Sequence, residues 1–158
     1  MQNQEIERKF LINWNEFQRS SFFDNGQRIE IEQGFLSRDK ERTVRVRKTS
    51  SNCTITVKGK SSKNGLARFE WQKQISEDDA TALLAIALPG TIIKTRHVFE
   101  YEGFTWELDE FHGNHVGLQI AEVELNHVDQ PITLPPFITV EVTGQKEFYN
   151  SYLSRIER

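Results

Sequence analysis

Most of the chain alternates between apolar and polar residues, which is the pattern of β-strands with two different faces. Turn signals such as Asn25-Gly26 and Asn64-Gly65 separate the alternating segments. Short turns between neighbouring strands favour antiparallel pairing. The pattern predicts eight or nine strands, drawn from residues 5–12, 28–36, 42–48, 54–58, 68–75, 92–101, 104–111, 119–125 and 138–143.

Helices are predicted at three places only. Ser76 is a typical N-cap, and Asp79 follows three residues later, as in a capping box. The acidic start and the Pro89-Gly90 stop predict a helix over residues 77–88. Two more helices are predicted over residues 14–22 and 147–156. The fold class is therefore α+β, mainly antiparallel β, with a few flanking helices.

The polar faces of the predicted strands carry an unusual number of charges. Six strands have charged residues two positions apart, so both side chains of a pair lie on one face. The residues between them, such as Val46, Trp106 and Val123, are apolar and need a core of their own. A solvated outer face explains any single pair, but like charges repel unless a group of opposite sign lies between them. The pairs are Glu5–Glu7, Arg45–Arg47, Arg68–Glu70, Lys94–Arg96, Glu107–Asp109 and Glu122–Glu124.

The whole set fits a closed eight-stranded β-barrel, with the apolar face under external helices and the charged face lining a wet tunnel. Carboxylates are the donors that Mg²⁺ or Mn²⁺ prefers, whereas arginine and lysine bind phosphate. Both signs in one tunnel suit a small polyanion with divalent cations. The acidic set is Glu5, Glu7, Glu107, Asp109, Glu122 and Glu124, and the basic set is Arg45, Arg47, Lys58, Arg68, Lys94 and Arg96.

Composition agrees with one globular domain spanning residues 1–158. Hydrophobic residues make up 37% of the chain and the net charge is −3. No apolar run or N-terminal signal region predicts membrane insertion or export, so we expect a cytoplasmic protein.

Cys53 is the only cysteine, which excludes an internal disulfide and favours a packing role. His112 and His115 flank Gly113-Asn114, and we expect an exposed loop rather than a zinc site.

The motifs resemble those of the CYTH, or triphosphate tunnel metalloenzyme, superfamily. Its N-terminal Glu-x-Glu-x-Lys signature is matched by Glu5, Glu7 and Lys9. The family often has a second glutamate after its Arg-x-Glu element, and here that position is Gln72. Further elements follow in family order at residues 33–36, 45–47, 56–59, 65–70, 94–96, 106–111, 121–125, 141–143 and 149–150.

This resemblance implies an antiparallel eight-stranded tunnel that holds a triphosphate, and it implies roles for individual residues. The implied catalytic residues are Lys9, Glu5 and Glu7. The implied metal ligands are Glu5, Glu7, Asp109, Glu122 and Glu124, with Glu70 and Glu107 as further acidic candidates. The implied phosphate ligands are Lys9, Arg45, Arg47, Lys58, Arg68, Lys94, Arg96 and Lys146.

The function that we expect is hydrolysis of a triphosphate, most simply inorganic tripolyphosphate, with two Mg²⁺ or Mn²⁺ ions. Alternatives within the family are a thiamine or nucleoside triphosphatase and a class IV adenylate cyclase. A non-catalytic module that binds polyphosphate or nucleotide is the alternative from another class. The expected partner is a small-molecule triphosphate rather than a nucleic acid or a membrane. Whether the chain forms a homodimer is left as an open question by the sequence.

Overall fold

The protein is a mainly antiparallel β structure, and a computed structural model describes its residues 3–155. The strands in this range are β1 (Gln4–Ile12), β2 (Gln27–Ser37), β3 (Arg42–Lys48), β4 (Cys53–Ser61), β5 (Ala67–Ile75), β6 (Ile92–Tyr101), β7 (Phe104–Phe111), β8 (Gln119–Glu124) and β9 (Ile138–Glu141). The helices are α1 (Trp14–Gln18), α2 (Ser21–Asn25), α3 (Glu77–Ala85) and α4 (Asn150–Leu153), with 3₁₀-helices η1 (Gly113–His115) and η2 (Lys146–Phe148).

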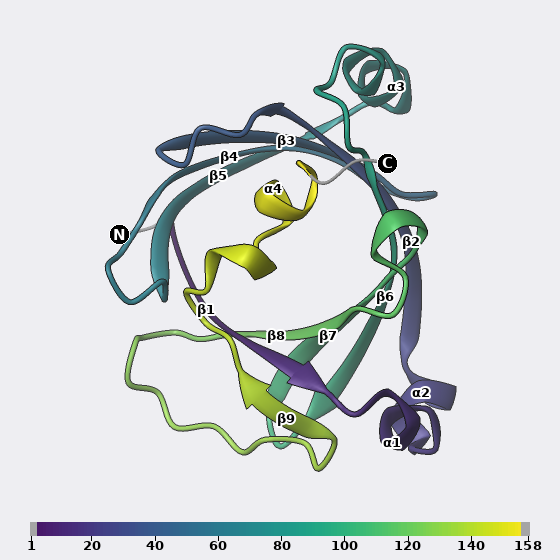
Figure 1. Cartoon of the computed structure of the whole chain (residues 1–158), viewed down its shortest axis with the longest axis vertical. Coiled ribbons are helices and arrows are strands. Elements are labelled where there is room, and N and C mark those ends of the chain that lie inside the picture. Colours follow the sequence, from purple (N-terminus) through teal and green to yellow (C-terminus); the bar gives the residue numbers. More distant parts are fainter. Residues whose placement is uncertain (1–2, 156–158) are drawn as a thin grey trace.

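Eight strands form a closed ring (Figure 1). Hydrogen-bonded neighbours follow the order β5-β4-β3-β2-β6-β7-β8-β1, and the start of β1 pairs with β5 to complete the circle. β9 pairs with the second half of β1, beyond the part that pairs with β5. Every pairing is antiparallel. The closed eight-stranded barrel predicted from the sequence is confirmed.

The segment after β1 forms two short helices, so the single helix predicted over residues 14–22 is wrong. The Asn13 side chain accepts a hydrogen bond from the Glu16 backbone N–H and begins α1. Ser20 is extended, and its hydroxyl donates to the Phe17 carbonyl oxygen at 2.6 Å. That bond satisfies a carbonyl at the end of α1, which favours a break before α2 begins.

The predicted helix starting after Ser76 is present as α3, and Ser76 caps it by accepting from the Asp79 backbone N–H. It ends at Ala85 rather than at residue 88. The predicted C-terminal helix is instead η2 followed by α4, and residue 156 of that prediction lies outside the described residues. No helix within residues 3–155 is long and apolar enough to cross a membrane.

The outer surface of the ring carries the main apolar core. Trp106, Leu108 and Val123 alternate with the charged residues of β7 and β8 and are at most 1% exposed. They pack in one cluster with Phe10 of β1 and Phe17 of α1. α3 packs over β3 and β4 in a separate small cluster. The external helices thus cover the apolar faces, as the alternation predicts.

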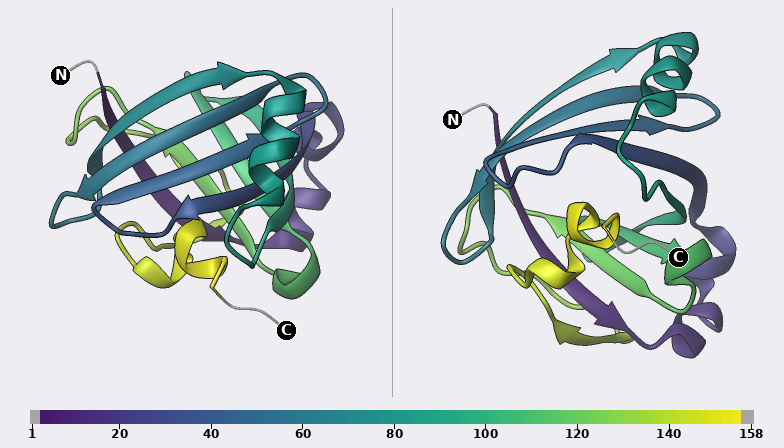
Figure 2. Two further views of the ribbon diagram at one scale, coloured as in Figure 1. Left: turned by 90° about the horizontal axis from the view of Figure 1, so that it is seen from above. Right: turned by 45° about the horizontal axis from the view of Figure 1, so that its top comes forward.

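One end of the ring is closed from within by apolar residues. Each strand residue of this apolar cluster lies two positions along its strand from a polar residue that faces inward. The inner face of the ring therefore changes from charged to apolar at this end. Figures 1 and 2 show η2 and α4 lying across this end of the ring rather than outside it. The C-terminal helix is therefore an exception to the predicted outside position. The cluster consists of Phe35, Ile92, Phe111, Ile120 and, from α4, Leu153.

Candidate functional site

The ring encloses a charged cavity of about 310 Å³. Asp109 does not line this cavity and lies buried in the wall behind it, while Lys146 is exposed on η2 and also lies outside the lining. The predicted site residues in the lining are Glu5, Glu7, Lys9, Arg45, Arg47, Lys58, Arg68, Glu70, Lys94, Arg96, Glu107, Glu122 and Glu124.

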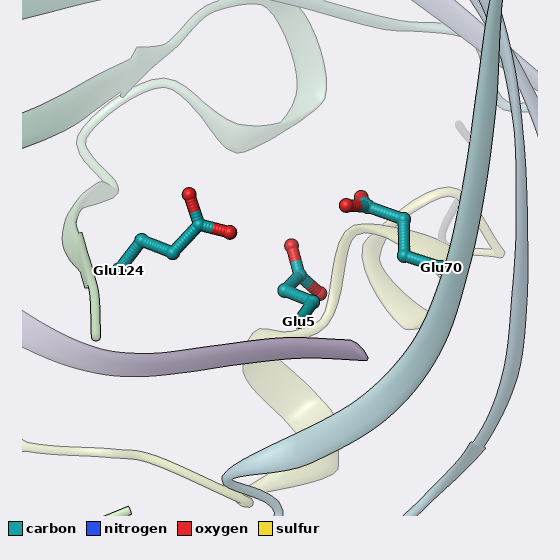
Figure 3. Close-up of side chains that lie close together, drawn as sticks. All are labelled: Glu5, Glu70 and Glu124. Atoms are coloured by element: carbon teal, nitrogen blue, oxygen red, sulfur yellow. The ribbon is translucent and has the colours of Figure 1, made fainter. Parts of the chain in front are cut away.

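Three carboxylates converge on one point of the cavity (Figure 3). Glu5 of β1, Glu70 of β5 and Glu124 of β8 each offer an oxygen, and these oxygens lie within 4.8 Å of one another. Burial, and then the charge of Glu5, raises the pKa of both Glu70 and Glu124. Lys58 Nζ lies 2.9 Å from Glu5 Oε1 and offsets part of this repulsion. Clustered carboxylate oxygens are suitable ligands for a hard divalent cation.

Lys9 lies between two further carboxylates. Its Nζ is 3.3 Å from Glu122 Oε2 and 3.9 Å from Glu7 Oε1. Burial alone would lower the pKa of Lys9, but Glu122 and Glu7 outweigh burial and raise it. Burial would raise the pKa of Glu122, yet Lys9 lowers it to about 2. Burial and the charges of Glu122 and Glu5 raise the pKa of Glu7 to about 8. Lys9 and Glu122 are thus a charged pair, and the pKa of Glu7 lies close to neutral pH.

Asp109 is fully engaged with two cations. Arg96 donates to both of its oxygens, at 2.7 and 2.9 Å, and Lys94 Nζ donates at 2.7 Å. Burial alone would raise the pKa of Asp109, but these cations hold it well below its usual value. Burial lowers the pKa of Lys94 to about 7, and Arg96 adds to that effect against the attraction of Asp109. Arg96 also reaches Glu107 at 3.1 Å. Asp109 is therefore ionised, with Arg96 as its stronger partner.

Two arginines of β3 add positive charge that protein carboxylates only partly balance. Burial is the largest cause of a lowered pKa at both Arg45 and Arg47, and Arg96 lowers both further. Arg45 Nη2 donates to Thr56 Oγ1 at 3.3 Å, but its buried Nε has no hydrogen-bond partner among residues 3–155. Such a buried donor costs free energy unless a ligand supplies an acceptor. Arg68 Nε donates to the Gly59 carbonyl oxygen.

Several uncharged polar residues complete the wall, and charge patterning alone did not single them out. Thr56 Oγ1 donates to Gln72 Oε1 at 2.8 Å, so the residue that departs from the family pattern still lines the cavity. Tyr149 and Asn150 join the wall from the C-terminal segment. Gln33 is buried and bonded to Asn150. The period-two rule, extended from charged to all polar residues, would have found Thr56 and Gln72, which lie two positions from Lys58 and Glu70. It would not have found Gln33, because on β2 this residue has the parity of Ile29 and Ile31.

The turn between the two histidines is exposed at Gly113 and Asn114, as expected, but the histidine side chains are less exposed than the turn. His112 and His115 are both partly buried. His112 Nε2 lies 2.7 Å from Thr95 Oγ1, and His115 Nε2 lies 2.8 Å from the Leu153 carbonyl oxygen. Within the described residues, neither histidine belongs to a cluster that could hold a metal ion.

Comparison with known proteins identifies the family. The CYTH domain matches residues 3–158. An inorganic triphosphatase of Acetivibrio thermocellus is 36% identical over 150 residues, which cover 94% of this chain and 92% of that protein. The crystal structure of the inorganic triphosphatase NE1496 is 29% identical, covers 95% of this chain and 97% of that one, and superposes with a TM-score of 0.62.

A more distant structure shares the fold. The PH1012 protein from Pyrococcus horikoshii OT3 is 20% identical over 84% of this chain and 80% of that one, with a TM-score of 0.61. The ring of strands and the extent of the sequence match agree with the motifs found along the chain. The chain belongs to the CYTH domain family.

Proposed function

We propose that the protein hydrolyses a phosphoanhydride bond of a triphosphate, with inorganic tripolyphosphate as its main substrate. Two relatives that span nearly the whole chain carry the name inorganic triphosphatase. The observation that carries the proposal is the cavity itself, in which a carboxylate trio faces buried arginines and lysines. A polyanion with bound divalent cations would complement both sets of charges.

The donor set fits a divalent cation, for which we propose Mg²⁺ or Mn²⁺. Glu5, Glu70 and Glu124 would hold it, because their oxygens already converge. When bound, such an ion would polarise phosphate oxygens and neutralise developing charge. Asp109 lies outside the lining and already accepts hydrogen bonds from Lys94 and Arg96, so we do not place it at this ion. A second ion stays a prediction of the sequence, and so do the metal-binding roles of Glu7 and Glu122.

The cationic residues would bind and orient the phosphates. Arg45 Nε is a buried donor without a partner, so a phosphate oxygen would satisfy it. Lys9 keeps its proton beside Glu122, so it would act as a hydrogen-bond donor to phosphate rather than as a base. The pKa of Glu7 is raised to about 8, so this carboxyl group would exchange a proton near neutral pH. These fixed charges would stabilise the charge that develops on the leaving phosphate.

A phosphate-release assay with tripolyphosphate, in Mg²⁺ or Mn²⁺ and after chelation, tests the proposal. We expect metal-dependent release that Lys58→Ala reduces by about tenfold or more, because that lysine lines the cavity. Lys63→Ala is the matched control, since Lys63 is exposed and outside the lining. No release with either metal would contradict the proposal.

A substrate panel distinguishes the alternatives. Faster turnover of thiamine triphosphate or ATP would favour an organic triphosphatase, and cyclic AMP with pyrophosphate would show a cyclase. Tight tripolyphosphate binding without turnover would favour a binding module. A cytoplasmic location and a homodimer stay predictions of the sequence.

A further inference from the structure

The junction between η2 and α4 contributes to a cavity wall that is built mostly by strands. Tyr149 and Asn150 line the cavity there, at the end of the ring that α4 closes. Lys9 Nζ lies 4.9 Å from the centre of the Tyr149 ring. Asn150 contacts Lys94 on β6 and Gln33 on β2. A segment that is not itself one of the ring strands therefore reaches two predicted anion-binding residues, Lys9 and Lys94.

The Asn150 side-chain oxygen joins two buried donors. Asn150 Oδ1 accepts from Lys94 Nζ at 2.8 Å and from Gln33 Nε2 at 2.7 Å. Gln33 Oε1 in turn accepts from Arg47 Nε at 3.1 Å. Gln33 is 0% exposed and Lys94 is 1% exposed, so water cannot readily replace these partners.

The orientation of both amides follows from the cations at the two ends of this chain. Lysine and arginine nitrogens only donate, so an amide oxygen must face each of them. Asn150 therefore presents Oδ1 to Lys94, and Gln33 presents Oε1 to Arg47. The remaining contact then runs from the Gln33 nitrogen to the Asn150 oxygen. One arrangement satisfies all three bonds, and it fixes the directions of both cations.

One N–H of Lys94 has no oxygen acceptor in the part of the chain that the structure describes. In its charged form, which a bound anion favours, Lys94 has three N–H groups, and Asp109 Oδ2 and Asn150 Oδ1 accept two of them. The centre of the Phe111 ring lies 5.3 Å from Lys94 Nζ. Lys94 also lines the cavity, so a bound oxygen can accept the third N–H. Without Asn150, the ammonium would have one anchor instead of two and would rotate about its contact with Asp109.

We propose that Asn150 is a positioning residue of the anion site: it holds Lys94 directly, and Arg47 through Gln33, in the directions in which they bind a phosphate group. The inference rests on the proposed triphosphate function. It gives the C-terminal segment a role in that site, which is to orient the cations that bind phosphate. Asn150 does not itself need to touch the substrate. Its loss should therefore weaken binding more than it slows the bond-breaking step.

The test compares Asn150→Ala with a variant of similar stability that leaves the hydrogen-bond chain intact. Ile120→Val serves as that control, because Ile120 packs in the same apolar cluster as Leu153. Tyr152→Ala, at an exposed position of α4, is the surface control. Thermal unfolding, calorimetric binding of tripolyphosphate after metal chelation, and kcat and KM with Mg²⁺ are measured for each.

We expect Asn150→Ala to raise Kd and KM for tripolyphosphate by about tenfold, the size of a lost charge-assisted contact, with a change in kcat below about twofold. Ile120→Val should lose melting temperature with Kd unchanged. Gln33→Leu should raise Kd in the same direction and should not add fully to Asn150→Ala, because both interrupt one chain. The Kd of the Gln33→Leu variant also tests the inference if Asn150→Ala does not fold.

Equal changes in Kd for Asn150→Ala and Ile120→Val at equal loss of stability would overturn the inference, because Asn150 would then be a packing anchor only. Full additivity with Gln33→Leu would also overturn it. Wild-type protein that neither binds nor hydrolyses tripolyphosphate would overturn the proposed function and this inference together. Wild-type activity with an unaffected Asn150→Ala variant would overturn this inference alone.

Discussion

At the residue scale, two side chains on one strand favour different charge states, Glu7 neutral and Lys9 charged, although the pKa of each is raised. Both face the cavity from β1, with Lys9 buried and Glu7 partly buried. Burial raises the pKa of Glu7 and would lower that of Lys9, whereas Glu122 raises both, because it repels the charge of Glu7 and attracts that of Lys9. The sequence identified both residues as site candidates. Their protonation depends on β8, which lies more than 100 residues further along the chain.

The raised pKa of Glu7 predicts a pH-dependent affinity for metal. Between its ordinary value of 4.5 and about 8, folded metal-free protein holds a proton that an unfolded chain has lost. Folding stability contributed by Glu7 therefore falls as pH rises through this window. A cation bound by Glu7 must displace that proton, so Mg²⁺ affinity should rise up to pH about 8 and then level off.

Mg²⁺ titration calorimetry between pH 6 and 9, in buffers of different ionisation enthalpy, counts the released protons. Glu7→Gln is the matched control, since it keeps the side-chain size and removes the titrating group. We expect it to weaken the pH dependence in this window, with the remainder due to Glu70 and Glu124, whose pKa values are also raised. Equal Mg²⁺ affinity at pH 6 and pH 8 in the wild-type protein would show that Glu7 does not titrate during metal binding.

At the element scale, α1 depends on a single buried ring. A five-residue helix is too short to be stable alone, so packing must hold it. Phe17 is 0% exposed, and its ring centre lies 5.1 Å from that of Phe137 and 5.8 Å from that of Phe99. Apolar alternation predicted the strand faces, but it did not show that these distant aromatic rings form one cluster.

Phe17→Ala should lower the free energy of unfolding by about 3–5 kcal/mol, the range for truncating a buried phenylalanine. Gln18→Ala on the same helix should change it by less than about 0.5 kcal/mol, because Gln18 is exposed. Urea denaturation measures both variants. Similar midpoints for the two would mean that the ring does not anchor α1.

At the scale of the whole molecule, the ring closes through a short contact. Three residue pairs join β1 to β5, including Glu5 opposite Arg68. The β4–β5 turn supports this closure by packing against the segment after β9, where Gly65 meets Gly144. Gly65 has a φ of +77°, and a Cβ built there would lie 2.2 Å from Gly144 Cα. Both the backbone conformation and the space require glycine.

Gly65→Ala should lower the free energy of unfolding by about 2–4 kcal/mol, the sum of backbone strain and a forced displacement. Gly103→Ala separates these effects, since Gly103 has a φ of +83° and nothing within 4 Å of an added Cβ. It should cost only about 1 kcal/mol. Chemical denaturation of both variants gives the comparison. Equal losses of unfolding free energy would show that the segment around Gly144 moves to accommodate the added Cβ at little cost.

Much of the site could be predicted because alternation assigns each strand residue to a face. Charged residues at one parity on six strands indicated a common interior, and the parity of Lys58 places Thr56 inward in the same way. The rule fails for Gln33, because the charged residues of β2, Glu30 and Glu32, have the other parity and are exposed. The same rule, continued past Lys94 and Asp109 to Ile92 and Phe111, indicates the apolar end of the ring. The packing of Leu153 against that apolar end was not predictable, since α4 belongs to a segment that is separate from the ring strands.

The sequence alone determined which side chains face inward, because a period of two is a local property of extended backbone. Only the tertiary structure decided which of them meet. Glu5, Glu70 and Glu124 converge because β1 pairs with both β5 and β8 when the ring closes. Asp109, with the same inward parity, is instead held by Lys94 and Arg96. Strand order and register set these distances, and no spacing along the chain encodes them.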